Sequence, residues 1–120
     1  EMEIGRLYGQ LLELRAGQYP ESSSPLAIFE EGLNMVQIRR LSTLLYEQKK
    51  GSVVMVCSGN GTEGEYQYAL GSSSMDMRTL SKDMNGKLHG RGGGSSLMAQ
   101  GTFRASRQSI TDVFQEETKS

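Results

Sequence analysis

Residues 86–101 read GKLHGRGGGSSLMAQG and decide how the chain is interpreted. Five glycines fall within residues 86–94, between a helical pattern and a strand-like run. Glycine costs backbone entropy, so a packed domain uses it where φ must be positive or where another backbone comes close. The run GRGGG can turn several backbone N–H groups toward one anion, and nearby cations favour phosphate. We predict a phosphate-binding glycine loop here; a flexible loop is the alternative, but the Ala-Gln-Gly that follows is too specific for a linker.

The segments around this run predict an α/β fold. Apolar spacing predicts helices over residues 3–16, 34–50, 77–89 and 106–117, and strands over residues 25–30, 52–57, 65–70 and 97–105. The order strand, helix, strand over residues 25–57 indicates a βαβ unit, and the continuous apolar run 52–57 indicates a central strand. A turn is expected over residues 58–64. We therefore expect a mixed β-sheet of about four or five strands with helices packed on it, preceded by a short N-terminal helix.

The helix over residues 34–50 has the clearest signals. Asn34 is a suitable N-cap, and Ile38, Leu41 and Leu45 form the buried stripe. Gly51 is expected at the C′ position, where a left-handed residue ends many helices. The last helix is expected to begin at Ser106 or Ser109.

The first predicted helix carries its own apolar stripe, formed by Ile4, Leu7, Leu11 and Leu14. A stripe on one short helix needs a partner, which is either the domain or a second copy of the chain. The chain opens Glu1-Met2, and we interpret it as a fragment of a larger protein. We expect residues 1–24 to be the tail of a connecting helix with a linker, and residues 25–120 to form the globular domain.

The stretch GKLHGRGGGSSLMAQGTF resembles the DHH-associated domain found at the C-terminus of alanyl-tRNA synthetases and of long freestanding alanyl-tRNA editing proteins. That family shows two glycines, a basic residue, three glycines and then Ala-Gln-Gly. Its first two glycines fall on His89 and Gly90, its basic residue on Arg91 and its triplet on residues 92–94. His89 departs from the pattern, and Ser95-Ser96 replaces a common basic-proline pair. The resemblance covers roughly residues 25–118, and it is strongest after Gly51.

The resemblance implies a non-catalytic domain that binds tRNA, with alanine tRNA as the expected partner and a homodimer as a second one. The expected RNA-facing residues are Lys87, Arg91, Gly92, Gly93, Gly94, Lys82, Arg104 and Gln100. Because Gly93 is expected to need positive φ, Gly93→Val should be more damaging than Arg91→Ala. No cofactor is expected in this chain; zinc and, for a synthetase, ATP would belong to other parts of the parent.

The distribution of charge agrees with a nucleic-acid partner. Residues 78–107 contain six basic residues and one acidic residue, a balance of +5, whereas the whole chain carries −1, so the other residues sum to −6. A basic region around a glycine run is the expected footprint of nucleic acid. The alternative is an ordinary solvated surface, since exposed helices normally carry Lys and Arg.

Few residues in the chain could carry catalysis. With one histidine and one cysteine, no pair has metal-ligand spacing, and Ser95 and Ser96 lack a partnered base. His89 is expected to be a surface residue, and Cys57 a buried small hydrophobe. Phosphate loops and dinucleotide fingerprints follow a strand and precede a helix, the reverse of the order here.

Two other functions remain open at this stage. A related domain closes the active site of DHH phosphoesterases, although there a histidine follows the glycines, whereas Ser95 does so here. A self-association module built on residues 3–16 is the other. A single cysteine suits a reducing cytoplasm, and the first twenty residues hold no apolar run, so neither a signal peptide nor a membrane partner is expected.

Overall fold

The structure is a computed structural model, and it describes residues 2–59, 64–72 and 74–119, with residues 2–9 described by their backbone alone. It contains one five-stranded mixed sheet in the order β1-β2-β3-β5-β4. The strands are β1 (Leu26–Phe29), β2 (Val54–Gly59), β3 (Tyr66–Gly71), β4 (Arg91–Gly94) and β5 (Met98–Phe103). β1 pairs with β2 in parallel, and every other pair is antiparallel. The predicted α/β class and sheet size are confirmed; the turn expected over residues 58–64 lies mostly outside the described residues.

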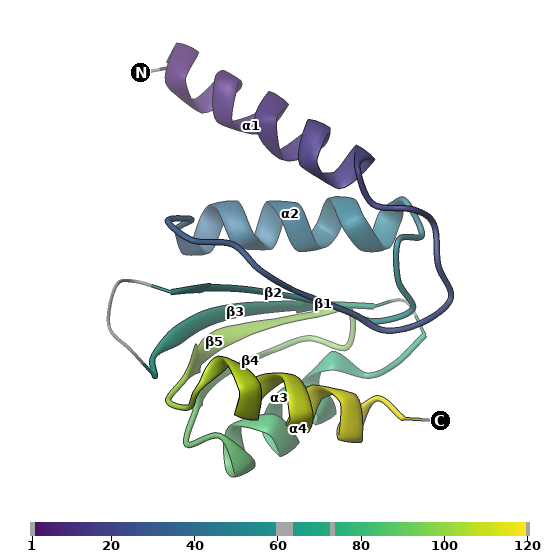
Figure 1. Cartoon of the computed structure of the whole chain (residues 1–120), viewed down its shortest axis with the longest axis vertical. Coiled ribbons are helices and arrows are strands. Elements are labelled where there is room, and N and C mark those ends of the chain that lie inside the picture. Colours follow the sequence, from purple (N-terminus) through teal and green to yellow (C-terminus); the bar gives the residue numbers. More distant parts are fainter. Residues whose placement is uncertain (1, 60–63, 73, 120) are drawn as a thin grey trace.

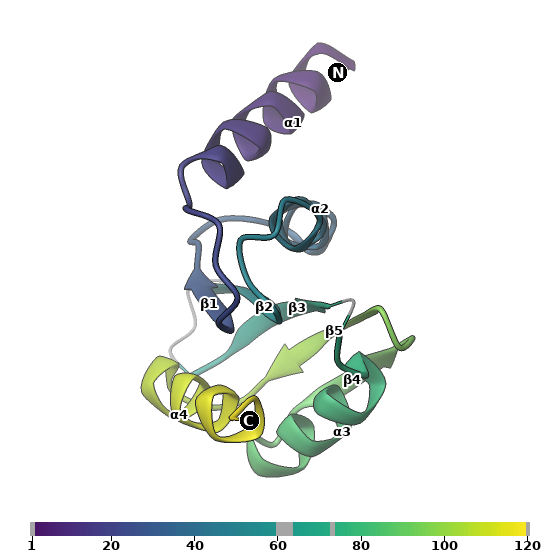
Figure 2. The ribbon, with the colours of Figure 1, turned by 90° about the vertical axis from the view of Figure 1, so that its right-hand side faces the viewer.

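Helices cover both faces of this sheet. They are α1 (Met2–Gly17), α2 (Met35–Glu47), α3 (Met77–Lys87) and α4 (Arg107–Glu117). α2 lies on one face with α1 outside it, and α3 and α4 lie on the other face (Figures 1 and 2). The βαβ unit predicted from residues 25–57 is the β1–α2–β2 segment.

The core has two halves because successive strand residues point to opposite faces of the sheet. Val54, Val56 and Ala69 pack toward α2 with Ile38, Leu41 and Leu45. The alternate residues pack toward α3 and α4; they include Met55, Cys57, Tyr68, Leu70 and Phe103. β2 is therefore buried on both faces, as expected from its continuous apolar run. Burial raises the pKa of the Cys57 thiol well above its usual value, which keeps the thiol protonated and inert.

The face of α1 that contacts the domain differs from the prediction. Leu12 and Ala16 are 3% and 0% exposed in the core beside α2, whereas Leu11 and Leu14 of the predicted stripe are 49% and 67% exposed. An ion pair from Arg15 to Glu30 also ties α1 to the residue after β1. The domain therefore buries the helix face that carries Leu12 and Ala16, and the neighbouring face with Leu11 and Leu14 stays exposed.

The start of α2 agrees with the sequence, and its end does not. Asn34 caps the helix by accepting a hydrogen bond from the Gln37 backbone N–H at 2.9 Å, and the Gln37 side chain accepts one in return. The C′ residue is Lys49, with φ of +60°, and not Gly51. Its neighbour Lys50 donates to the Leu45 carbonyl at 2.9 Å, which completes a Schellman ending. Gly51 serves close packing, since an added Cβ would lie 2.9 Å from Leu26 Cβ.

The glycine run is also not the predicted loop. α3 ends at Lys87, His89 adopts φ of +52°, and Gly90 donates to the Asn85 carbonyl at 2.9 Å. His89 therefore takes the left-handed C′ position that glycine prefers. Arg91–Gly94 then forms β4 at the edge of the sheet.

Candidate nucleic-acid interface

β4 and β5 form a tight hairpin at the sheet edge. Ser95 N–H donates to the Met98 carbonyl at 2.7 Å, which leaves Ser96 and Leu97 as a two-residue connection. Hydrogen-bonded and non-hydrogen-bonded pairs alternate along an antiparallel ladder. Because Ser95 is hydrogen-bonded to Met98, Gly93 and Arg91 are expected to form the next hydrogen-bonded pairs, with Gln100 and Thr102 of β5. Gly92 and Gly94 form the non-bonded pairs and turn their backbone N–H and C=O groups outward.

The same alternation divides β4 into two rows. The α3-facing row consists of Gly92 and Gly94, which pair with Gly101 and Ala99. The α2-facing row consists of Arg91 and Gly93, which pair with Thr102 and Gln100. Tyr68, which packs among α3 residues, pairs with Gly101, and this fixes which face each row occupies.

The α3-facing row is packed too closely for any side chain. A Cβ on Gly92 would lie 2.2 Å from the Gln100 carbonyl oxygen, and one on Gly101 would lie 2.0 Å from the Arg91 carbonyl oxygen. Gly92 also has φ of +152°, a conformation that L-residues rarely adopt. Gly93 differs on both counts, because its φ is not positive and an added Cβ would meet nothing within 4 Å. The expectation that Gly93 needs positive φ is therefore wrong; that requirement belongs to Gly92.

Tyr68 fills the space that these glycines leave. Its ring stacks on Phe103 with centroids 3.9 Å apart, and its hydroxyl lies 2.8 Å from the position of a Cβ on Gly92. The hydroxyl hydrogen-bonds Ser81 Oγ at 2.7 Å and donates to Asn85 Oδ1 at 3.1 Å. Burial raises the pKa of Tyr68. The ring thus supports the glycine strand from below and links it to α3.

Side chains of α3 also cover the outer edge of β4. Arg78 Nε donates to the Gly94 carbonyl at 3.4 Å, and Asn85 Nδ2 donates to the Gly92 carbonyl at 3.5 Å. Both are long hydrogen bonds, but they confirm that these two carbonyls point away from β5. Capping an edge in this way protects it from pairing with another strand.

The α2-facing row, in contrast, borders an uncovered surface. α2 packs on β2 and β3, and the upper side of β5 and β4 extends beyond it (Figure 2). A pocket of about 330 Å³ opens there between the hairpin and Arg39 of α2, with Gly93 and Gln100 in its lining. We call this surface the open face: Arg39, Arg91, Gly93, Gln100 and Thr102. Within the described ranges, neither Arg39 nor Arg91 has an ion-pair partner.

The structure separates the residues that the sequence grouped together. Arg91, Gly93 and Gln100 lie on the open face. Lys87 lies on α3 and pairs with Glu117 of α4, Nζ to Oε1, at 2.8 Å, and this hydrogen bond raises the pKa of Lys87. Lys87 is thereby on the opposite side of the sheet from the pocket.

The outer cations also occupy different places. Lys82 is exposed on α3, one turn after Arg78, beside the β4 edge. Arg104 follows β5, and its backbone N–H donates to the Leu88 carbonyl at 3.0 Å, so it lies near the His89 end of the strand. These two cations flank the glycine strand without lining the pocket.

Sequence reasoning missed Arg39 and the role of Arg78. Arg39 is sixty-one residues from Gln100 and follows the buried stripe residue Ile38, so only the strand order could show that it borders β5. Arg78 was counted among the basic residues of 78–107, and its spacing from Asn85, seven residues along one helix face, was the available signal.

Among the described residues, no group of three His, Cys, Asp or Glu side chains could hold a metal ion. No described helix is long and apolar enough to cross a membrane.

No protein-family model and no curated protein sequence matches the chain. The C-Ala domain of Aquifex aeolicus alanyl-tRNA synthetase matches its structure with a TM-score of 0.70 and 21% identity, over 83% of this chain and 97% of that one. This chain has the C-Ala fold. The resemblance drawn from the glycine run is therefore confirmed at the level of the fold.

The C-Ala fold also lies within longer chains. The exonuclease RecJ bound to manganese matches with a TM-score of 0.67 and 11% identity, over 96% of this chain and 27% of that one. CDC45 from Entamoeba histolytica matches with a TM-score of 0.54 and 10% identity, over 78% of this chain and 23% of that one. The chain thus spans about a quarter of each of these two proteins.

Proposed function

We propose that this chain is a non-catalytic tRNA-binding domain, the C-terminal part of an alanyl-tRNA synthetase or of an alanyl-tRNA editing hydrolase. One observation carries the proposal: on the open face, Arg39 lines a pocket whose lining includes Gly93, and Arg91 precedes Gly93 by two residues in the same row of β4. Among the described residues, neither arginine has an ion-pair partner. The C-Ala fold and the Ala-Gln-Gly signature support it. Alanine tRNA is the proposed partner, and the cytoplasm the proposed location.

The open face suits a ribose-phosphate backbone. Arg91 and Arg39 can each donate to a phosphate in a bidentate way, and Gln100 and Thr102, which pair with Gly93 and Arg91, add polar groups to the same face. Gly93 lets the RNA backbone come close to the sheet. Such contacts position RNA without reading its sequence, so binding by one small domain should be weak and strongly salt-dependent.

Binding of alanine tRNA across a salt series tests this proposal. We expect Arg91→Ala and Arg39→Ala each to weaken binding and to reduce the slope of log K against log salt by about one. Lys119→Ala, on the far side of the domain, is the matched control and should leave the slope unchanged. Equal affinity and slope for both arginine variants and the unmodified protein would contradict the proposal.

The phosphoesterase alternative has less support from the site. The match to an exonuclease concerns the fold, and the histidine that the alternative requires after the glycines is absent, because Ser95 follows Gly94. His89 lies at the other end of β4 as the C′ residue of α3.

Self-association through α1 is the second proposed function, favoured by the exposure of Leu11 and Leu14. In the sequence, Ile4, Leu7, Leu11 and Leu14 follow the 3-4-3 spacing of a two-stranded coiled coil. We expect Leu14→Glu to abolish any concentration-dependent dimer seen by sedimentation, with Leu11→Lys as a second disruption. A dimer that survives both changes would place the contact elsewhere.

A further inference from the structure

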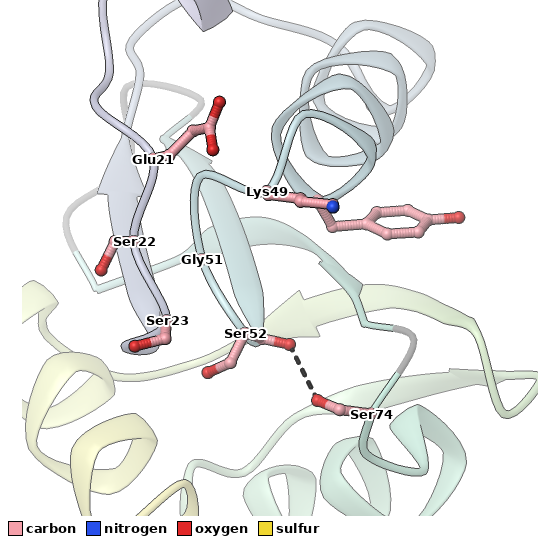
Figure 3. Close-up of a pocket in the computed structure, with 8 residues that line it drawn as sticks. Glu21, Ser22, Ser23, Lys49, Gly51, Ser52 and Ser74 are labelled. Atoms are coloured by element: carbon pink, nitrogen blue, oxygen red, sulfur yellow. Dashed lines mark hydrogen bonds between the residues drawn. The ribbon is translucent and has the colours of Figure 1, made fainter.

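A second pocket lies at the other end of α2, away from the open face. It has a volume of about 540 Å³ and is lined by Glu21, Tyr46, Lys49, Gly51, Ser52 and Ser74, among others (Figure 3). The volume lies within the usual range for small-molecule sites. Most of these side chains carry oxygen or nitrogen, and the rest of the lining is apolar, so the pocket combines polar groups with an apolar surface.

The walls of this pocket are fixed by backbone contacts. Ser22 N–H donates to the Lys49 carbonyl at 2.9 Å, and Ser52 N–H donates to the Ser24 carbonyl at 3.1 Å. Gly51 allows this approach, since its Cβ would lie 3.1 Å from the Ser24 carbonyl oxygen. Ser74 Oγ donates to the Ser52 carbonyl at 3.2 Å and closes the lower side (Figure 3).

Lys49 is held in a conformation that disfavours lysine. Its φ of +60° is left-handed, a region that is strained for an L-residue and that glycine occupies freely. Residues in such regions concentrate at functional sites. Lys49 lines the pocket, and Figure 3 shows its side chain extending to the side away from Glu21, Ser22 and Ser23.

The groups that face the pocket have capacity left for a ligand. Among the described residues, the Lys49 ammonium, the Glu21 carboxylate and the Ser52 hydroxyl have no hydrogen-bond or ion-pair partner. Lys49 and Glu21 carry opposite charges in one pocket without pairing. Tyr46 adds an aromatic wall, fixed over Gly71, where a Cβ would lie 2.7 Å from its Cδ2.

We propose that this pocket binds a ribonucleoside monophosphate. Lys49 and the Ser52 hydroxyl hold the phosphate, because an ammonium and a hydroxyl are its ordinary donors. The Tyr46 ring packs against the base. The Glu21 carboxylate accepts hydrogen bonds from the ribose hydroxyls, as acidic residues do in dinucleotide sites. The site shares no residue with the open face and does not depend on tRNA binding there.

Titration of the ¹⁵N-labelled chain with AMP, followed by NMR, tests the proposal. We expect saturable shifts at the amides of residues 21–24 and 49–52, and weaker binding of 2′-deoxy-AMP. Lys49→Gly should weaken AMP binding about tenfold, the effect of one charge-assisted contact, while raising the melting temperature, because it relieves the left-handed strain. A gain in stability removes unfolding as an explanation.

Three controls make the result decisive. Lys50→Ala removes the adjacent charge and should leave AMP binding unchanged, whereas an equal loss in both lysine variants would mean unspecific attraction and would overturn the site. Glu21→Gln should remove the preference for AMP over its 2′-deoxy form. Arg91→Ala should leave AMP binding intact even if it abolishes tRNA binding, so the two proposals can fail separately. Absence of shifts at residues 49–52 in the unmodified protein would overturn the site.

The source of the nucleotide is resolved by a second titration. Short oligoribonucleotides with a free 3′ hydroxyl are compared with the same chains blocked by a 3′ phosphate. If the oligoribonucleotide with a free 3′ hydroxyl binds more tightly than AMP, the ligand is an RNA end. Equal or weaker binding would identify a free nucleotide, and either result supports the pocket.

Discussion

The two rows of β4 both contain glycine, but they use it in opposite ways. In the α3-facing row, Gly92 and Gly94 lie against β5 and the Tyr68 ring, so the absence of a side chain is a steric requirement. In the α2-facing row, an added Cβ on Gly93 would meet nothing within 4 Å, and Gly93 lines a pocket with Arg39 and follows Arg91 by two residues in the same row. Identical residues in one short strand therefore serve packing on one face and access on the other.

This difference teaches how a glycine run should be analysed. The run as a whole resembles a phosphate loop, but only its alternation against β5 shows which residues are fixed and which are free. Substitutions that act on one row at a time should separate the two roles.

The largest effect is expected for Gly92→Ala. Its Cβ would clash with the Gln100 carbonyl and its φ is positive, so we expect a loss of about 3 kcal/mol or more in the free energy of unfolding. The matched variant Gly93→Ala should stay within about 0.5 kcal/mol of the unmodified chain. Urea denaturation of both variants measures this, and equal losses would show that the rows do not differ.

Tyr68→Phe tests the support beneath the α3-facing row. Loss of the hydroxyl removes its hydrogen bonds to Ser81 Oγ and Asn85 Oδ1, so these two groups keep only the long bonds that Asn85 Nδ2 makes, and we expect a cost of about 1–2 kcal/mol. Because burial raises the pKa of Tyr68 above its usual 10.0, its contribution is present below pH 10 and is lost as pH rises further. Stability of the variant should therefore fall less steeply in alkali, with Cys57 still contributing in the same direction. An unchanged alkaline slope would contradict this.

His89→Gly tests the residue that directs the chain into β4. Glycine occupies the left-handed C′ position without strain, so we expect a gain of about 0.5–1 kcal/mol. His89→Ala retains a Cβ and should give no such gain. Thermal melts of the pair measure the difference, and a gain of the same size in the alanine variant would locate the effect in the imidazole.

The smallest effect is expected for Lys87→Ala. Lys87 is exposed and pairs with Glu117 below the sheet, so its loss should lower the melting temperature only slightly. Since the pKa of Lys87 is raised, the pair contributes below pH 10.5 and is lost as pH rises above it. Binding of tRNA should be unchanged. A loss of tRNA affinity as large as that caused by Arg91→Ala would show that Lys87 contacts the RNA.

The sequence by itself determined the elements and their order. Short-range periodicity located all four helices and four of the five strands, and the caps Asn34 and Ser106 follow from side chains that reach backbone groups three residues away. The burial of β2 on both faces was evident from its continuous apolar run. These features are local, so neighbouring residues contain the information.

Tertiary structure alone decided the use of the glycines and the neighbours of the arginines. Gly92 is constrained by Gly101, its partner across the hairpin, and by Tyr68 of β3, which reaches it only because β3 and β4 both pair with β5. The burial of Leu12 in place of Leu11 in α1 follows from packing against α2, and the close approach of Gly51 to Leu26 follows from the position of β1. Glycine has no side chain to show a preferred face, so a run of glycines leaves its register to the strand that pairs with it.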